Sequence, residues 1–403
     1  MVLTCAGILS LYIDRVIRIY RAQRSADSVQ IAGLERAIQL SPGNADFHDL
    51  LGVQLSASDE DSESASASLR RAVALNPNRA RYWLDLAAVY QVADDVREQN
   101  EAVQTALNAE PGNPEVAGEA GLFFLVAGDL DRALPLFRRA LAQNPEAAAN
   151  ILPACWRNTR NANLMLASVI PDSPDLQLQF LGLLTQQKEA AAANQVWHYL
   201  ITSGRNFPPR LSFFYLDCLV KERDVAGFDR AWHELARLNP TLRNYLPSDN
   251  LIVNAGFEQP ILNSGFDWRH ESAGHVAAAI DDTVAHSESR SLSLFYDGNP
   301  AYDAGWMQLV PVQPNAEYQL SLWIKSENVT TSSGPRVAIA DAYSGANLLL
   351  TDDVLDTHPW QEMTGTFRAP VSTQLIAVKI LRAPADTRIR GRVWIDDLRL
   401  VKK

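Results

Sequence analysis

Apolar residues in roughly the first 245 positions recur at the three- and four-residue spacing of amphipathic helices, and prolines interrupt them at regular steps. Pro42, Pro77, Pro111 and Pro145 stand 35, 34 and 34 residues apart, each after a helical stretch. Proline can open a helix but cannot continue one, so each proline marks the start of a new helix. The pattern predicts pairs of helices repeated along the chain.

Residue sizes inside one unit support this repeat. In the unit after Pro111, small residues at Gly121 and Ala133 allow two helices to approach, and Phe124 and Phe137 fill the space between units. The period and these sizes resemble the tetratricopeptide repeat, which implies a stack of helix pairs whose groove holds a protein partner. No regular row of asparagines lines that groove, so a peptide clamp is not supported. We expect this all-α repeat domain to span residues 27–247.

After residue 247 the pattern changes from helical spacing to the alternation of strands, with turn signals between short segments. The expected strands are Ser291–Phe295, Met307–Val312, Glu317–Lys325, Arg336–Asp341, Gln361–Arg368, Gln374–Leu381 and Arg392–Leu400. Many strands without helices between them predict an all-β jelly-roll sandwich over residues 248–403. The fold class is therefore multidomain, with a helical solenoid followed by a sandwich.

Two motifs frame this second domain: it opens with NLIVNAGFE at Asn250–Glu258 and closes with VWIDDLRL at Val393–Leu400. Between them lie two further motifs, QLVPV at Gln308–Val312 and then YQLSLWIK at Tyr318–Lys325. The set resembles the galactose-binding-like jelly roll of carbohydrate-binding modules, broadly families 4, 9 and 22. The resemblance covers residues 249–403 and is more specific for the fold than for sugar binding.

The resemblance implies a structural calcium ion where the first and last strands meet. Glu258 and Asp397 occupy the matching motif positions, and Asp396 can alternate with Asp397. Carboxylate and carbonyl oxygens are the ligands that calcium prefers. The alternative is that these carboxylates only cap strands or hydrogen-bond loops.

A sugar site needs aromatic rings for stacking and a few polar groups for the hydroxyls. The candidate aromatic residues are Trp268, Tyr302, Trp306 and Trp360, and the candidate polar residues are Arg269, Asp303 and Asp341. Trp268 and Tyr302 lie in loop-like sequence contexts, so we expect this pair to be exposed. Trp323 and Trp394 alternate with apolar neighbours inside strands, so we expect them in the core.

The net charge and the motifs exclude several classes of function. The formal net charge is −11, which argues against nucleic acid as a partner because phosphate binding needs a basic face. Three cysteines offer neither a disulfide framework nor metal-type spacing. His270 and His275 are five residues apart, whereas the helical zinc motif needs four. We find no sequence pattern for catalysis and predict a non-enzyme.

The first 26 residues form an apolar N-terminal segment with two possible roles. Met1–Ile13 is apolar, too short to cross ~30 Å of hydrocarbon as a helix, and is followed by Arg15, Arg18 and Arg21. It is either the tail of a membrane anchor that begins upstream, which we favour, or an amphipathic helix on the first repeat. The anchor interpretation predicts membrane association through residues 1–20 and an extracytoplasmic location, periplasmic or in the cell envelope.

Together these features predict a scaffold whose repeats bind a protein and whose sandwich binds a glycan, in cell-surface polysaccharide assembly or export. Two alternatives stay open. One is a membrane-tethered assembly factor with no sugar ligand. The other is an accessory subunit of a polysaccharide-processing enzyme.

Overall fold

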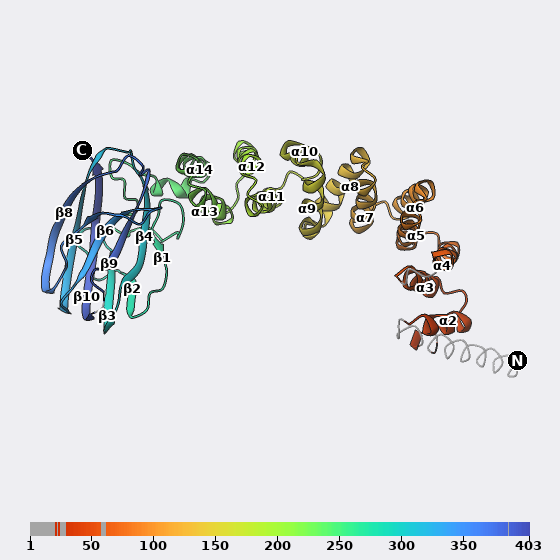
Figure 1. Ribbon diagram of the computed structural model, residues 1–403, viewed down its shortest axis with the longest axis horizontal. Helices are drawn as coiled ribbons and strands as arrows, with labels where there is room; N and C mark the ends of the chain where they lie inside the picture. Colours follow the sequence, from red (N-terminus) through yellow and green to blue (C-terminus); the bar gives the residue numbers. More distant parts are fainter. Residues whose placement is uncertain (1–20, 22, 25–29, 58–61, 386) are drawn as a thin grey trace, which may run out of the picture. The chain divides into compact units, whose positions relative to one another are not determined.

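The computed structural model describes residues 21, 23–24, 30–57, 62–385 and 387–403, and it confirms the predicted fold class (Figure 1). The predicted apolar segment 1–26 lies outside the described residues except for Arg21, Gln23 and Arg24. The described part of the chain contains no helix with the length and apolar content needed to cross a membrane.

Helices fill the first part of the chain. They are α2 (Ile31–Leu40), α3 (Ala45–Ala57), α4 (Ser62–Leu75), α5 (Ala80–Val92), α6 (Val96–Ala109), α7 (Pro114–Val126), α8 (Leu130–Gln143), η1 (Pro145–Ala147), α9 (Ala148–Thr159), α10 (Ala162–Ser168), α11 (Pro174–Gln186), α12 (Ala190–Thr202), η2 (Pro209–Ser212), α13 (Phe213–Lys221), α14 (Val225–Leu238) and η3 (Pro240–Tyr245). Contacts within the chain form two compact units. The first ends at Leu183, and the second runs from Leu184 to Lys403, apart from Asn194–Val196, which group with the first.

Repeated local signals build the helix pairs of the first unit. Asp95 and Asp129 cap α6 and α8 by accepting hydrogen bonds from backbone N–H groups three residues later. The residue before each cap, Asp94 or Gly128, has a positive φ that turns the chain between the two helices. Gly121 on α7 faces the Phe137 ring, where an added Cβ would lie 2.8 Å from a ring carbon. The small-against-large packing that the sequence indicates is therefore present.

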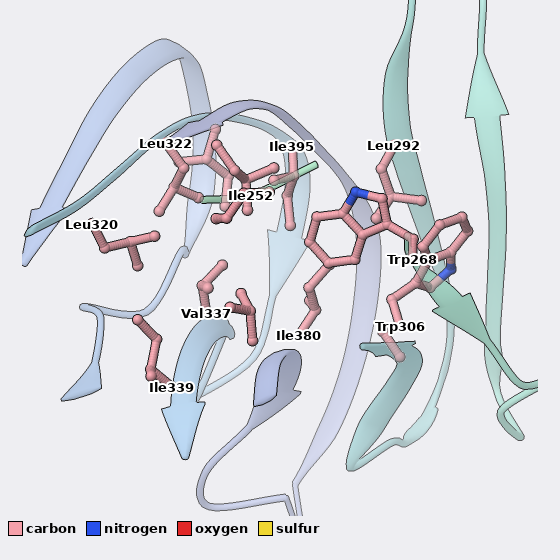
Figure 2. Close-up of a cluster of buried hydrophobic side chains, with 14 of the residues drawn as sticks. Ile252, Trp268, Leu292, Trp306, Leu320, Leu322, Val337, Ile339, Ile380 and Ile395 are labelled. Atoms are coloured by element: carbon pink, nitrogen blue, oxygen red, sulfur yellow. The ribbon is translucent and has the colours of Figure 1, made fainter. Parts of the chain in front are cut away.

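The second unit contains the sandwich. Its strands are β1 (Arg269–His270), β2 (Val276–Asp281), β3 (Ser291–Pro300), β4 (Asp303–Pro311), β5 (Glu317–Thr330), β6 (Pro335–Asp341), β7 (Asn347–Leu350), β8 (Asp356–Arg368), β9 (Leu375–Arg382) and β10 (Arg388–Lys402). The first sheet has the order β1-β4-β9-β6-β7 and the second β2-β3-β10-β5-β8, and neighbouring strands are antiparallel in both. Alternate residues of both sheets, such as Ile380 and Ile395, meet in one apolar core (Figure 2).

The first sheet is also covered on its outer side. Leu309 of β4 and Leu375 and Ala377 of β9 point away from the core and pack against Val225 of α14. Strands buried on both faces carry apolar residues in succession, which accounts for the sequence QLIAVKIL around β9. Helices α13 and α14 therefore belong physically to the sandwich. The predicted domain limit at residues 247 and 248 marks the change from helices to strands and stays a prediction.

Candidate functional site

A cavity of about 550 Å³ opens beside β1 and β4 at the edge of the first sheet. It unites three of the seven residues that the sequence proposes for sugar binding, Arg269, Asp303 and Trp306. Sequence inspection did not select the other lining residues, which are Asn263, His270, Glu271, Ser272, Ala273, Gly305, Met307 and Lys379. No local signal marks them, because they come together only through the pairing of β1 with β4.

A turn at the start of β4 shapes the cavity. Gly305 has φ +75°, and a Cβ there would lie 1.8 Å from the Glu271 carbonyl oxygen, so only glycine fits. Glu271, which follows β1, is also hydrogen-bonded to this turn, because its N–H donates to the Gly305 carbonyl oxygen at 2.8 Å. The Asp303 carboxylate accepts from the Gly305 N–H at 2.8 Å and fixes the same turn.

Two residues that line the cavity carry buried donors with no acceptor within the protein. The Arg269 guanidinium donates through Nη1 to Asp217 Oδ1 at 2.8 Å, whereas its Nε and Nη2 are buried without a partner. Trp306 Nε1 is buried and unpartnered as well. Buried donors of this kind normally hold a water or a ligand.

His270 completes the polar wall. Its ring lies 4.8 Å from the Trp306 ring, and burial lowers the pKa of the imidazole below its usual value. A neutral imidazole offers one donor and one acceptor. With the carboxylates of Glu271 and Asp303, the cavity presents both donors and acceptors, the mixture that sugar hydroxyls require.

Trp268 contradicts the predicted exposure. Its side chain is fully buried, stacks on Phe257 at 5.2 Å and donates from Nε1 to the Asn254 carbonyl at 3.1 Å. It is a core residue and cannot serve as a stacking platform (Figure 2). Trp306 is also 97 % buried, its exposure being 3 %, and only borders the cavity.

The remaining candidates lie apart from one another. Tyr302 is 63 % exposed, as expected for its loop context. Asp341 ends β6, where its carboxylate accepts from the N–H groups of Tyr343 and Ser344 and shapes a turn. Trp360 lies on β8, the edge strand of the second sheet.

A second aromatic group appears on the outer side of the second sheet. Trp323, expected in the core, is only partly buried and stacks on His286 with ring centroids 3.9 Å apart. Trp360 meets the same His286 ring edge-on at 5.6 Å. Trp394, also expected in the core, is buried but lies outside the core cluster that holds its neighbours Val393 and Ile395, and Lys325 and Arg392 cover its ring.

The three predicted calcium ligands hold the loop that contains His286. Glu258 accepts from the Ser289 and Arg290 N–H groups at 2.9 and 2.7 Å. The Asp397 carboxylate accepts from His286 Nδ1 and the Ser287 hydroxyl, both at 2.6 Å. Asp396 accepts from the N–H groups of the same two residues at 2.8 and 3.2 Å.

These contacts match the alternative role as loop anchors. Every side-chain oxygen of the three carboxylates already accepts a protein hydrogen bond, including Asp396 Oδ1 from the Asp397 N–H. Over the part of the chain that the structure describes, no group of three or more His, Cys, Asp or Glu residues is arranged to hold a metal ion. The calcium site stays a prediction.

Residues 249–384 match the family model described as a carbohydrate binding domain. The predicted resemblance is confirmed for the C-terminal domain. Solved structures that resemble parts of the chain include a CBM4 structure, which is 17 % identical and covers 38 % of this chain and 99 % of that one, with a TM-score of 0.29. MamA is 25 % identical over 30 % of this chain and 69 % of its own, with a TM-score of 0.26. PilF of Pseudomonas aeruginosa is 19 % identical and covers 56 % of this chain and 92 % of its own, with a TM-score of 0.30.

The chain thus joins an array of helix pairs to a sandwich that matches the family model of a carbohydrate binding domain. This combination supports a role in binding or scaffolding.

Proposed function

We propose that this protein is a non-enzymatic scaffold that binds a glycan through the cavity beside β1 and β4 and a protein partner through its helical repeats. The match of residues 249–384 to the carbohydrate-binding family carries the glycan half of the proposal. The buried, unpartnered donors of Arg269 and Trp306 support this cavity as the site. A neutral glycan fits best, because Lys379 and Arg269 are balanced by Glu271 and Asp303 in the same wall.

The setting we propose is the assembly or export of cell-surface polysaccharide in the cell envelope, with residues 1–20 as a membrane anchor. A binding domain joined to a repeat array is suited to hold a polymer beside the proteins that process it. Fractionation of cells that express the full chain tests the location, and recovery in the soluble cytoplasmic fraction alone would reject it.

A glycan array probed with the full chain tests the glycan half. Wild-type protein should bind a defined group of glycans, and Arg269→Ala should weaken that binding at least about tenfold, since a charged hydrogen-bond donor is removed. Arg368→Ala is the matched control, because Arg368 is 70 % exposed on β8 of the other sheet. Absence of binding by folded wild-type protein would leave a scaffold whose sandwich makes protein contacts.

A further inference from the structure

Helix α13 reaches the candidate glycan site from outside the sandwich. Asp217 lies on α13, and its Oδ1 accepts from Arg269 Nη1 at 2.8 Å. Arg269 belongs to β1 and lines the cavity. A residue of the last helix pair therefore contacts a residue of the proposed binding site directly.

We propose that α13 and α14 form part of the carbohydrate-binding unit and that Asp217 is a positioning residue for Arg269. This inference rests on the proposed glycan function of the cavity. It adds a residue that lies outside the part of the chain matched by the carbohydrate-binding family, which begins at residue 249.

The segment leading into β1 is fixed on α14 by aromatic packing. Phe266 meets Phe228 edge-on at 4.9 Å and Trp232 at 6.0 Å. Gly265 lies so close to Trp232 that an added Cβ would be 2.2 Å from a ring carbon, and its φ of +61° favours glycine. The path of the backbone just before Arg269 is thus set by α14.

Hydrogen bonds reinforce the same contact. Trp232 Nε1 donates to the Tyr245 carbonyl at 2.9 Å, and the Tyr245 hydroxyl donates to the Pro260 carbonyl at 2.7 Å. Both tryptophan and tyrosine keep their polar atoms satisfied while their rings are buried. Helix α14, η3 and the 260–268 segment are therefore packed against one another.

This rigid base lets Asp217 orient the guanidinium. A guanidinium carries five N–H donors in a fixed plane, so holding Nη1 also fixes the directions of Nε and Nη2. Those two nitrogens are the ones without a protein acceptor. Ordering the side chain before the ligand arrives lowers the entropic cost of binding, which should appear as higher affinity.

The test measures affinity of the full chain for the glycan that binds best on the array. Asp217→Ala should weaken binding by about tenfold, and Asp217→Glu should restore most of it, because the carboxylate is what holds the guanidinium. Asp217→Ala leaves the Arg269 guanidinium, whose side chain is only 19 % exposed, without an acceptor, so we expect a lower melting temperature, and affinity is compared where circular dichroism shows that both proteins are folded. Asp229→Ala is the control, because Asp229 is 50 % exposed on the neighbouring helix α14 and pairs only locally with His233.

A double-mutant cycle separates positioning from general damage. In an Arg269→Ala background, Asp217→Ala should have no further effect on affinity, because its influence passes through Arg269. Equal binding by wild type and Asp217→Ala would overturn the inference, and so would tighter binding, which would make Asp217 a competitor of the ligand. An equal loss in Asp229→Ala would also overturn it. If wild-type protein binds no glycan, the proposed function itself fails. That outcome differs from glycan binding that is insensitive to Asp217→Ala, which would overturn only the positioning role.

Discussion

At the residue scale, Trp268 and Tyr302 have similar glycine-containing sequence surroundings and very different environments. Trp268 is fully enclosed against Phe257, whereas Tyr302 is 63 % exposed. We predict that Trp268→Ala lowers the free energy of unfolding of the sandwich by about 3–5 kcal/mol, the usual cost of removing a buried tryptophan. Tyr302→Ala should change it by less than about 0.5 kcal/mol. Urea denaturation followed by circular dichroism measures both, and similar small losses would refute the core assignment.

Asp49 in the helical unit gives a second residue-scale prediction. Its side chain is only 7 % exposed on α3, and Oδ1 has no partner. Burial, followed by the nearby Asp85 carboxylate, raises its pKa from 3.8 to about 7, against the lowering effect of Arg81. Arg81 is already engaged by Asp85 through two hydrogen bonds of 2.8 and 2.6 Å, and therefore cannot fully neutralise Asp49.

Because the folded-state pKa is raised, the folded chain keeps a proton that the unfolded chain loses. Stability of the helical unit should therefore fall as pH rises from about 4 to about 7 and then level off. We expect Asp49→Asn to remove this fall and to stabilise the unit at pH 8 by roughly 2–4 kcal/mol, from about 1.4 kcal/mol per pKa unit. Denaturation at a series of pH values checks this, with exposed Glu101→Gln as the control. A variant that keeps the wild-type pH profile would refute it.

At the element scale, the loop that contains His286 is held through hydrogen bonds to Glu258, Asp396 and Asp397, and these bonds occupy the side-chain oxygens that a calcium ion would need. We therefore expect EDTA to leave the melting temperature of the full chain unchanged. Asp397→Ala should lower the stability of the sandwich by about 1–3 kcal/mol, because His286 and Ser287 lose their acceptor. A calorimetric scan with and without about 10 mM calcium, which exceeds the dissociation constants of extracellular calcium modules, decides this. A large calcium-dependent rise in melting temperature would instead establish the metal site.

Elements with strong periodicity could be predicted from the sequence. All seven expected strands are present. Three strands were not predicted: β1 has only two residues, β2 is rich in alanine, which does not favour strands, and β7 has only four residues. Exposure was harder to predict, because Trp268 and Trp323 depend on partners distant in sequence, Phe257 and His286.

At the scale of the whole molecule, the union of α13 and α14 with the sandwich could not be foreseen. The continuous apolar run of β9 indicates a strand that is buried on both faces, but it does not say which element covers the second face. Val225 precedes Leu309 and Leu375 by more than 80 residues. The same limit applies to the cavity, because Arg269 and Lys379 meet only through the strand order.

This union predicts shared stability. Gly265→Ala should destabilise α14 and the strands of the first sheet together, by roughly 2 kcal/mol or more, because it combines backbone strain with a clash against Trp232. Gly345→Ala is the matched control: its φ is +72°, and nothing lies within 4 Å of the added Cβ. Hydrogen exchange should show faster exchange in both α14 and β4 for Gly265→Ala alone. Independent changes in the helix and the sheet would contradict the shared unit.

The cover over Leu309, Leu375 and Ala377 also bears on protein engineering. A gene fusion that begins at residue 249 would contain the sandwich without Val225, Phe228 and Trp232. It would expose an apolar surface on the first sheet. Such a graft invites aggregation in a host protein. A cut placed ahead of Phe207, between α12 and η2, would carry the helix pair along and deliver the sandwich with its surface intact.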